Sequence, residues 1–355
     1  RNWTIYYSQL PRNVKQVGNP AVKVEPVNGN FFKMYPTESF TPLASGDSMR
    51  IIFLCSYKID RNSHAPEGTY WVATADGKES SPLPVTLNTL ALPSPESLPG
   101  YPDATKIYES NLRLENVSAL QPWDILPSVK KATSAEGAVV LDGKVALAYP
   151  DAYAVEARLL KEKLSALYGL EVVDKAPVTI ALETLTDKAK AVNDEYYDLV
   201  IDSDRIKISA ATPHGVFNGT QTLLAMLKGK EAPYRLDAMS VEDYPDLLYR
   251  GQMIDIARNF TTVDNLKKLV DVFASYKMNV LHFHFSDDEA WRLEIPGLEE
   301  LTAVGSRRGH TTDESRCLYP CYDGGYDPDA ATVSNGYYSR EDFIGLLRYA
   351  AERHI

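Results

Sequence analysis

The sequence predicts a multi-domain chain: an N-terminal β-sandwich, an α+β middle domain and the first part of a parallel α/β domain. Its 355 residues exceed the size of one ordinary domain. Short alternating apolar runs fill the first 90 or so residues, whereas strand-like and helix-like segments alternate after residue 249. We place the three domains at residues 1–115, 116–246 and 247–355.

The N-terminal segment has the pattern of antiparallel strands. Alternating runs at residues 3–7, 49–53 and 70–73 are separated by turn-rich pieces such as VNGN and ADGK. This spacing favours a β-sandwich. Residues 91–103, rich in Pro and Ser, indicate an extended linker or a covering strand.

The middle segment mixes strands with two helices. Apolar residues at helical spacing predict helices over 152–168, which Gly169 ends, and over 215–227. The strands that we expect here lie at residues 138–141, 145–148, 178–182, 197–201 and 206–210.

The third segment has the order strand, helix, strand. We expect strands at 251–256 and 280–285 with a helix at 263–276 between them. A loop of about 50 residues then leads to a helix at 339–353 and to a third strand that begins at His354. Strands that alternate with helices form a parallel sheet, and a loop this long usually serves function.

Charge and composition limit the partners. The formal net charge of −11 argues against nucleic acid, and no apolar run is long enough to span a membrane. The chain begins with Arg1, so we expect a processed or engineered N-terminus.

The three cysteines suggest no metal centre. Cys55 stands in an apolar run and is expected to be a buried free thiol. Cys317 and Cys321 either close a small disulfide or stay reduced. A zinc site would need two more ligands, and only His310 lies near.

Charged side chains follow two predicted strands. Asp287 and Asp288 end the strand at 280–285, where functional residues of parallel folds collect, although acids here can also cap the next segment. Arg258 follows the strand at 251–256 and can present its donors to two neighbouring hydroxyls, or pair with Asp255, Asp287 or Asp288. Both roles can hold at once, and Asp255 itself is expected to be structural.

His282 and His284 project from one face of their strand. They form either a metal pair, as in barrel hydrolases with an HxH on their first strand, or residues with a core or hydrogen-bonding role. The second interpretation is favoured because the other four histidines offer no paired spacing. We therefore expect no metal.

Residues 249–295, which include RGQMIDIAR and KMNVLHFHFSDDEAWRLEI, closely resemble the opening of the catalytic domain of glycoside hydrolase family 20. Residues 336–355 resemble the family's next helix, and residues 211–227 the closing helix of the α+β domain before the barrel. The N-terminal segment looks like the β-sandwich of the chitobiase-like branch. The resemblance implies that the third domain is the start of a truncated (β/α)8 TIM barrel.

The resemblance also implies roles for single residues. Arg258 matches the family's arginine that holds the 3- and 4-hydroxyls of the sugar, and Asp287 matches the acid that supports the catalytic centre through a later histidine. His284, Asp288 and Trp291 match supporting positions. One departure is Glu289, which stands where Gln is common.

The implied activity is that of a β-N-acetylhexosaminidase without metal or organic cofactor. Such enzymes remove terminal β-linked N-acetylglucosamine or N-acetylgalactosamine from glycans, with the substrate's acetamido oxygen as nucleophile. The family's catalytic Asp-Glu pair is expected beyond Ile355, so we expect none of the catalytic acids in this chain and no useful turnover. The substrate implies an exported protein, periplasmic or at the cell surface.

Two other functions compete with this interpretation. The N-terminal domains could form a carbohydrate-binding or scaffolding module, which exposed-looking aromatic residues such as Trp3 and Trp71 favour, although most aromatics of this kind serve core or edge packing. A metal-dependent barrel hydrolase built on His282 and His284 is the third interpretation, which bound zinc would support.

Overall fold

The computed structural model describes residues 2–10, 15–16, 18–55, 64–88, 104–113, 125–321 and 324–355. The linker expected at 91–103 lies outside these residues. The chain divides into two compact units. The first combines Arg1–Leu114, Ile254–Thr262 and Phe283–Phe343, and the second combines Glu115–Met253, Val263–His282 and Ile344–Ile355.

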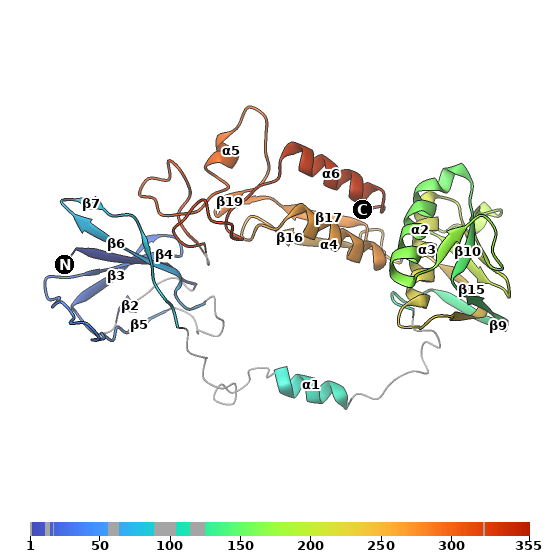
Figure 1. Cartoon of the computed structure of the whole chain (residues 1–355), viewed down its shortest axis with the longest axis horizontal. Helices are drawn as coiled ribbons and strands as arrows, with labels where there is room; N and C mark the ends of the chain where they lie inside the picture. The colour runs from blue at the N-terminus through green and yellow to red at the C-terminus, as the bar shows by residue number, and fades with distance from the viewer. Residues whose placement is uncertain are drawn as a thin grey trace. The chain divides into compact units, whose positions relative to one another are not determined.

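The N-terminal strands form a six-stranded antiparallel sheet in the first unit (Figure 1). Its order is β3-β4-β1-β6-β7, with β8 also paired to β6. The strands are β1 (Trp3–Ser8), β3 (Val22–Asn28), β4 (Phe31–Pro36), β6 (Glu67–Ala75), β7 (Lys78–Glu79) and β8 (Leu83–Pro84). A separate two-stranded sheet pairs β2 (Lys15–Gln16) with β5 (Phe53–Leu54).

The strand expected at residues 49–53 is wrong in all but its last residue. Only Phe53 lies in a strand, whereas Met49 and Ile51 line a cavity against the sheet without strand pairing. An alternating apolar pattern reports that alternate side chains are covered. It does not report whether the backbone finds a ladder partner.

One face of the N-terminal sheet packs against the long loop that follows β19. Tyr6, Phe31, Tyr70 and Val72 form a small core there, joined by Tyr319 and Tyr326 of the loop. Loop and sheet are thus parts of one compact unit.

Hydrogen bonds add to this apolar contact. His310 lies with Nδ1 3.0 Å from the Tyr70 hydroxyl and with Nε2 2.9 Å from a Glu79 carboxylate oxygen. The Tyr6 hydroxyl donates to the other Glu79 oxygen at 2.9 Å. A single loop histidine therefore bridges two strands of the sheet.

The middle segment forms a seven-stranded mixed sheet in the order β11-β10-β12-β14-β13-β15-β9. The strands β11, β10, β12 and β14 run parallel to one another. The pairs β14–β13, β13–β15 and β15–β9 are antiparallel. The strands are β9 (Lys131–Leu141), β10 (Lys144–Ala148), β11 (Glu171–Val173), β12 (Thr179–Thr184), β13 (Tyr197–Ile201), β14 (Arg205–Ala210) and β15 (Tyr234–Asp243). All five expected strands are present, and β11 and β15 are additional.

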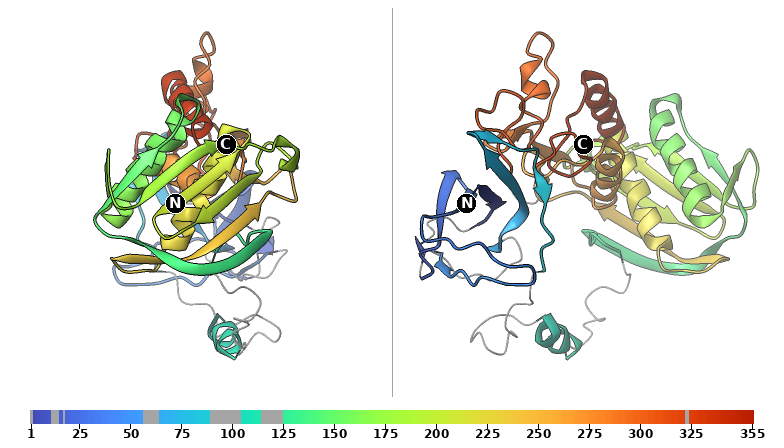
Figure 2. Two further views of the ribbon diagram at one scale, coloured as in Figure 1. Left: turned by 90° about the vertical axis from the view of Figure 1, so that its right-hand side faces the viewer. Right: turned by 60° about the vertical axis from the view of Figure 1, so that its left-hand side comes forward.

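Two helices, α2 (Ala154–Tyr168) and α3 (Pro213–Leu227), pack against each other beside this sheet (Figures 1 and 2). Thr212 caps α3 by accepting the Gly215 amide at 3.1 Å, and Pro213 begins the helix. A Cβ on Gly219 would lie 2.5 Å from Ile208 of β14, so α3 can approach the sheet only with glycine there. Gly169, at φ 63°, ends α2 as expected.

One helix precedes the middle segment, and two 3-10 turns lie within it. The helix α1 (Ala104–Leu112) has no buried residue. Single 3-10 turns, η3 (Asp151–Tyr153) and η4 (Lys188–Lys190), precede α2 and β13.

The third segment begins with β16 (Gly251–Asp255), α4 (Val263–Ser275) and β17 (Val280–His284). The two strands pair with each other, and the buried Leu266, Val270 and Phe273 give α4 its apolar face. The hairpin β18 (Ser286–Asp287) and β19 (Ala290–Trp291), then α5 (Glu300–Ala303) and α6 (Arg340–Ala351), follow. Nothing more of a barrel is seen among the described residues, so the TIM barrel remains a prediction.

The third strand expected at His354 is wrong. His354 adopts a left-handed conformation at φ 60°, and the amides of His354 and Ile355 donate to carbonyls of α6. These residues close the helix, because its last carbonyls need donors. Among the described residues, no helix has the length and apolarity needed to cross a membrane.

All three cysteines are free thiols. Cys317 and Cys321 are buried and unbridged, so the disulfide alternative is wrong, and burial raises the pKa of Cys321 to about 12. Cys55 is only half-buried, contrary to expectation, and lies 2.9 Å from the Gln9 side-chain amide.

Candidate functional site

The ends of β16 and β17 are tied together by their backbones. The amides of Ile256 and Ala257 both donate to the His284 carbonyl at 3.2 Å. Ile256 and Ala257 are buried, whereas the next residue, Arg258, is only half-buried. This arrangement brings Arg258 beside the end of β17.

Three carboxylates surround the Arg258 guanidinium. Nη1 lies 3.1 Å from Asp255 and closer still to Asp287, and Nε lies 2.8 Å from Glu289. Asp255 also accepts the Arg258 amide at 3.1 Å, so it fixes both the backbone and the side chain. Two of the three ion-pair partners considered from the sequence are correct, and Glu289 takes the place of Asp288.

The excess of negative charge sets the electrostatics of this site. Partial burial alone would lower the pKa of Arg258, but the charges of Glu289, Asp255 and Asp287 outweigh it and raise that pKa. The guanidinium is permanently charged and held in one orientation. Among the described residues Nη2 has no hydrogen bond or ion pair, so it is the donor available to a ligand.

His284 and Asp287 form the second part of the site. His284 Nε2 lies 2.8 Å from Asp287 Oδ2 and 3.1 Å from Arg258 Nη1. The Asp288 amide, which donates to Asp287 Oδ1 at 2.8 Å, is the largest of the effects that lower the pKa of Asp287, followed by His284 and Arg258. Asp287 is therefore ionised at neutral pH.

Asp288 and Trp291 lie near this cluster without joining it. Asp288 contributes its backbone amide, while its side chain is exposed. Trp291 pairs with Ser286 across the hairpin, and its indole donates to the Leu293 carbonyl. Both residues shape the turn that carries Asp287 and Glu289.

The two histidines of β17 lie in different surroundings. His282 is exposed, so a core role is wrong for it, whereas the half-buried His284 has the hydrogen-bonding role through Asp287. The described residues contain no group of three or more His, Cys, Asp or Glu side chains able to hold a metal ion.

Three models of known protein families match the chain. Residues 247–355 match "Glycosyl hydrolase family 20, catalytic domain", and residues 123–244 match "Glycosyl hydrolase family 20, domain 2". The chain belongs to glycosyl hydrolase family 20. Residues 1–93 match a third model, described as a putative carbohydrate binding domain.

Relatives of this family 20 chain support the assignment. It is 29% identical to N,N'-diacetylchitobiase of Vibrio harveyi over 367 residues, which cover 100% of this chain and 40% of the relative. It is 38% identical to β-hexosaminidase B of Pseudoalteromonas piscicida over 160 residues, 45% of this chain and 20% of the relative. The chain therefore spans less than half the length of these relatives.

A solved structure shares the fold of the whole chain. The family 20 exo-β-N-acetylglucosaminidase of Vibrio harveyi, solved with N-acetylglucosamine, superposes with a TM-score of 0.74 at 23% identity. The match covers 100% of this chain and 51% of that one.

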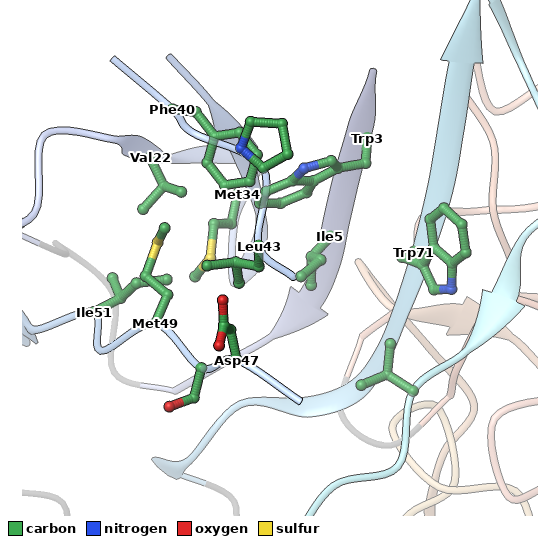
Figure 3. A pocket seen from close by; sticks show the side chains of 13 residues that line it. Trp3, Ile5, Val22, Met34, Phe40, Leu43, Asp47, Met49, Ile51 and Trp71 are labelled. Carbon is green, nitrogen blue, oxygen red and sulfur yellow. The ribbon is translucent and has the colours of Figure 1, made fainter. Parts of the chain in front are cut away.

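The N-terminal domain of this family 20 chain contains a cavity of its own (Figure 3). It has a volume of about 610 Å³ and lies between the sheet and the segment that contains Met49 and Ile51. Trp3 contacts Phe40 edge-to-face at 5.5 Å, and Trp71 and Asp47 also line the cavity. Its lining is mainly apolar.

Proposed function

We propose that this chain provides the sugar-holding part of a β-N-acetylhexosaminidase that acts on glycans ending in N-acetylglucosamine or N-acetylgalactosamine. The single observation that carries the proposal is the Arg258 guanidinium, held by three carboxylates with Nη2 left for a ligand. The two N–H groups of Nη2 can donate to two neighbouring hydroxyl oxygens of a sugar ring. Membership of the family supplies the substrate class.

In this proposal the carboxylates preorganise Arg258 before the sugar arrives. A guanidinium that is already fixed loses little freedom on binding, so its hydrogen bonds contribute more fully to binding the transition state. The ionised Asp287, fixed by His284 and the Asp288 amide, supports the catalytic centre through a histidine further along the chain. Bond cleavage itself relies on the substrate's acetamido oxygen.

We assign no step of bond cleavage to the described residues. The Asp-Glu pair that the resemblance implies is expected after Ile355, and the 355-residue chain is expected to be inactive alone. The enzyme is also proposed to be exported, which cell fractionation of the source organism would test.

The test is the release of a chromogenic phenol from its β-N-acetylglucosaminide. The present chain is compared with one extended to the length of its chitobiase relatives, and the longer chain is expected to be the active one. Arg258→Ala in the longer chain should lower kcat/KM by about 100-fold or more, since hydrogen bonds to a charged group contribute roughly 1.5–3 kcal/mol each. Arg340→Ala, an exposed arginine, is the matched control.

Activity of the 355-residue chain equal to that of the longer one would overturn the assignment of the chemistry to later residues. Wild-type kcat/KM in Arg258→Ala would overturn the sugar-holding role.

Carbohydrate binding by the N-terminal domain is the second candidate function. It is favoured by the two indoles that line the cavity of Figure 3, because aromatic faces stack on sugar rings. Titration of the whole chain with chitooligosaccharides, followed by tryptophan fluorescence, should show saturable binding that Trp71→Ala abolishes. Binding that survives in Trp71→Ala but is lost in Arg258→Ala would place it at the Arg258 site instead.

A further inference from the structure

Two arginines are buried completely behind the Arg258 site. Arg292, next to β19, and Arg308, in the loop after α5, are both 0% exposed and are among the largest fully buried side chains. Burial of a charge destabilises the folded state unless hydrogen bonds replace the lost hydration. The hydrogen-bond acceptors of these two guanidinium groups therefore indicate which part of the structure they stabilise.

Arg308 binds the backbone that carries the sugar-holding groups. Its Nη2 donates to the Ala257 carbonyl at 2.8 Å and its Nη1 to the Arg258 carbonyl at 3.3 Å. Its Nε donates to the Glu289 carbonyl at 2.5 Å. One rigid fork thus holds two residues whose side chains form an ion pair with each other.

Arg292 binds the same backbone from the hairpin. It donates to the carbonyls of Ile256 and Ala257 at 3.1 and 3.0 Å, and so shares the Ala257 carbonyl with Arg308. Its Nη1 also donates to the carbonyls of Ser306 and Gly336 at 3.1 and 2.9 Å. Burial and the neighbouring charge of Arg308 lower the pKa of Arg292 to about 10, which leaves it charged at neutral pH.

We propose that Arg308, together with Arg292, is a positioning residue for Arg258. The pair, here called the arginine brace, fixes the backbone of residues 256–258 and 289 and thereby the distance between the Arg258 and Glu289 side chains. A lysine could not replace either member, because a single ammonium cannot donate in one plane to carbonyls from different segments. The inference rests on the proposed sugar-holding role of Arg258.

The brace differs from general structural support in one measurable respect: it acts through Arg258. The effect of Arg308→Lys on catalysis should therefore depend on whether Arg258 is present. Arg307 offers a matched control, since it is the preceding residue, is exposed, and pairs with Asp329 at 3.0 Å on the surface.

The test is a double-mutant cycle in the chain extended beyond Ile355, with kcat/KM for the chromogenic β-N-acetylglucosaminide as readout. Arg308→Lys should lower kcat/KM about tenfold in the wild-type background but less than about twofold in Arg258→Ala, since residues that share one function are not additive. Arg307→Lys should change kcat/KM less than about twofold in both backgrounds.

Equal losses from Arg308→Lys in the two backgrounds, or no loss in either, would overturn the brace. The proposed function is judged separately, by the effect of Arg258→Ala alone. If Arg308→Lys does not fold, as judged by its thermal transition, the same cycle with Arg292→Lys decides by the same criterion.

Discussion

A buried ion pair in the second compact unit allows a quantitative prediction on this chain itself. Lys277 follows α4, and its Nζ donates to Asp243 at 2.8 Å and to the Tyr197 hydroxyl at 2.9 Å. The side chains of Lys277 and Asp243 are only 10% and 9% exposed. Lys277→Met keeps most of the side-chain volume and leaves the Asp243 carboxylate without its counter-charge.

The cost follows from the partners that remain. Removing one member of a buried ion pair typically costs about 3–5 kcal/mol of folding free energy. Asp243 would keep two donors, the Tyr197 hydroxyl at 2.8 Å and the Lys130 amide at 3.1 Å, which places the expected loss near about 3 kcal/mol. Burial lowers the pKa of Lys277 although Asp243 acts in the opposite direction, so the ion pair only partly offsets desolvation.

The assay is thermal unfolding of the purified chain at pH 7. A loss of about 3 kcal/mol should lower the Tm of this unit by roughly 6–12 °C. Lys131→Met is the control, because Lys131 and Glu242 pair at 2.8 Å but are 64% and 41% exposed. An exposed pair contributes at most about 1 kcal/mol, so the control should lose only about 2–4 °C.

The double variant Lys277→Met/Asp243→Asn should recover more than half of the loss, because both buried charges are then gone. A Lys277→Met chain as stable as the Lys131→Met control would refute the reasoning, and so would a double variant less stable than Lys277→Met.

Three further predictions concern pH, the site and the loop. Burial lowers the pKa of His214 to about 4, below its unfolded value, so its contribution to stability is complete above pH 6.5 and is lost as the pH falls toward 4. Because His214 is partly exposed, the wild-type chain should lose about 1–2 kcal/mol of unfolding free energy over that pH range. Thermal unfolding measured at each pH should show this loss in the wild type and not in His214→Gln. Asp287→Asn removes one carboxylate from the ion pairs of Arg258 and should lower kcat/KM of the extended chain about tenfold with little change in Tm. An unchanged kcat/KM would show that Asp287 does not act in the site. His310→Phe leaves the buried Tyr70 hydroxyl without this partner and should cost about 1–3 kcal/mol in thermal unfolding, whereas no change would mean that the contact is not formed in solution.

Local sequence signals predicted the regular elements well. The helix expected at 215–227 is α3, which its apolar spacing predicted because burial of one helix face is decided within about 15 residues. It begins two residues earlier than expected, at Pro213, since the cap at Thr212 was not used in that prediction. The strand β15 was missed because its apolar–polar alternation changes phase after Ala238, where a β-bulge lies between Asp237 and Met239. The strand predicted at 49–53 is wrong because the side chains there are covered although the backbone has no strand partner before Phe53.

By itself, the sequence determined that Arg258 and Asp287 follow neighbouring strands, and hence that a guanidinium and a carboxylate would meet at one edge of a parallel sheet. Only the tertiary structure decided that Glu289 rather than Asp288 completes the cluster, and that Arg292 and Arg308 are buried behind it. The physical reason is distance along the chain. Arg308 reaches carbonyls of residues 51, 50 and 19 positions away, and such contacts depend on the path of the loop between them, which no local periodicity encodes.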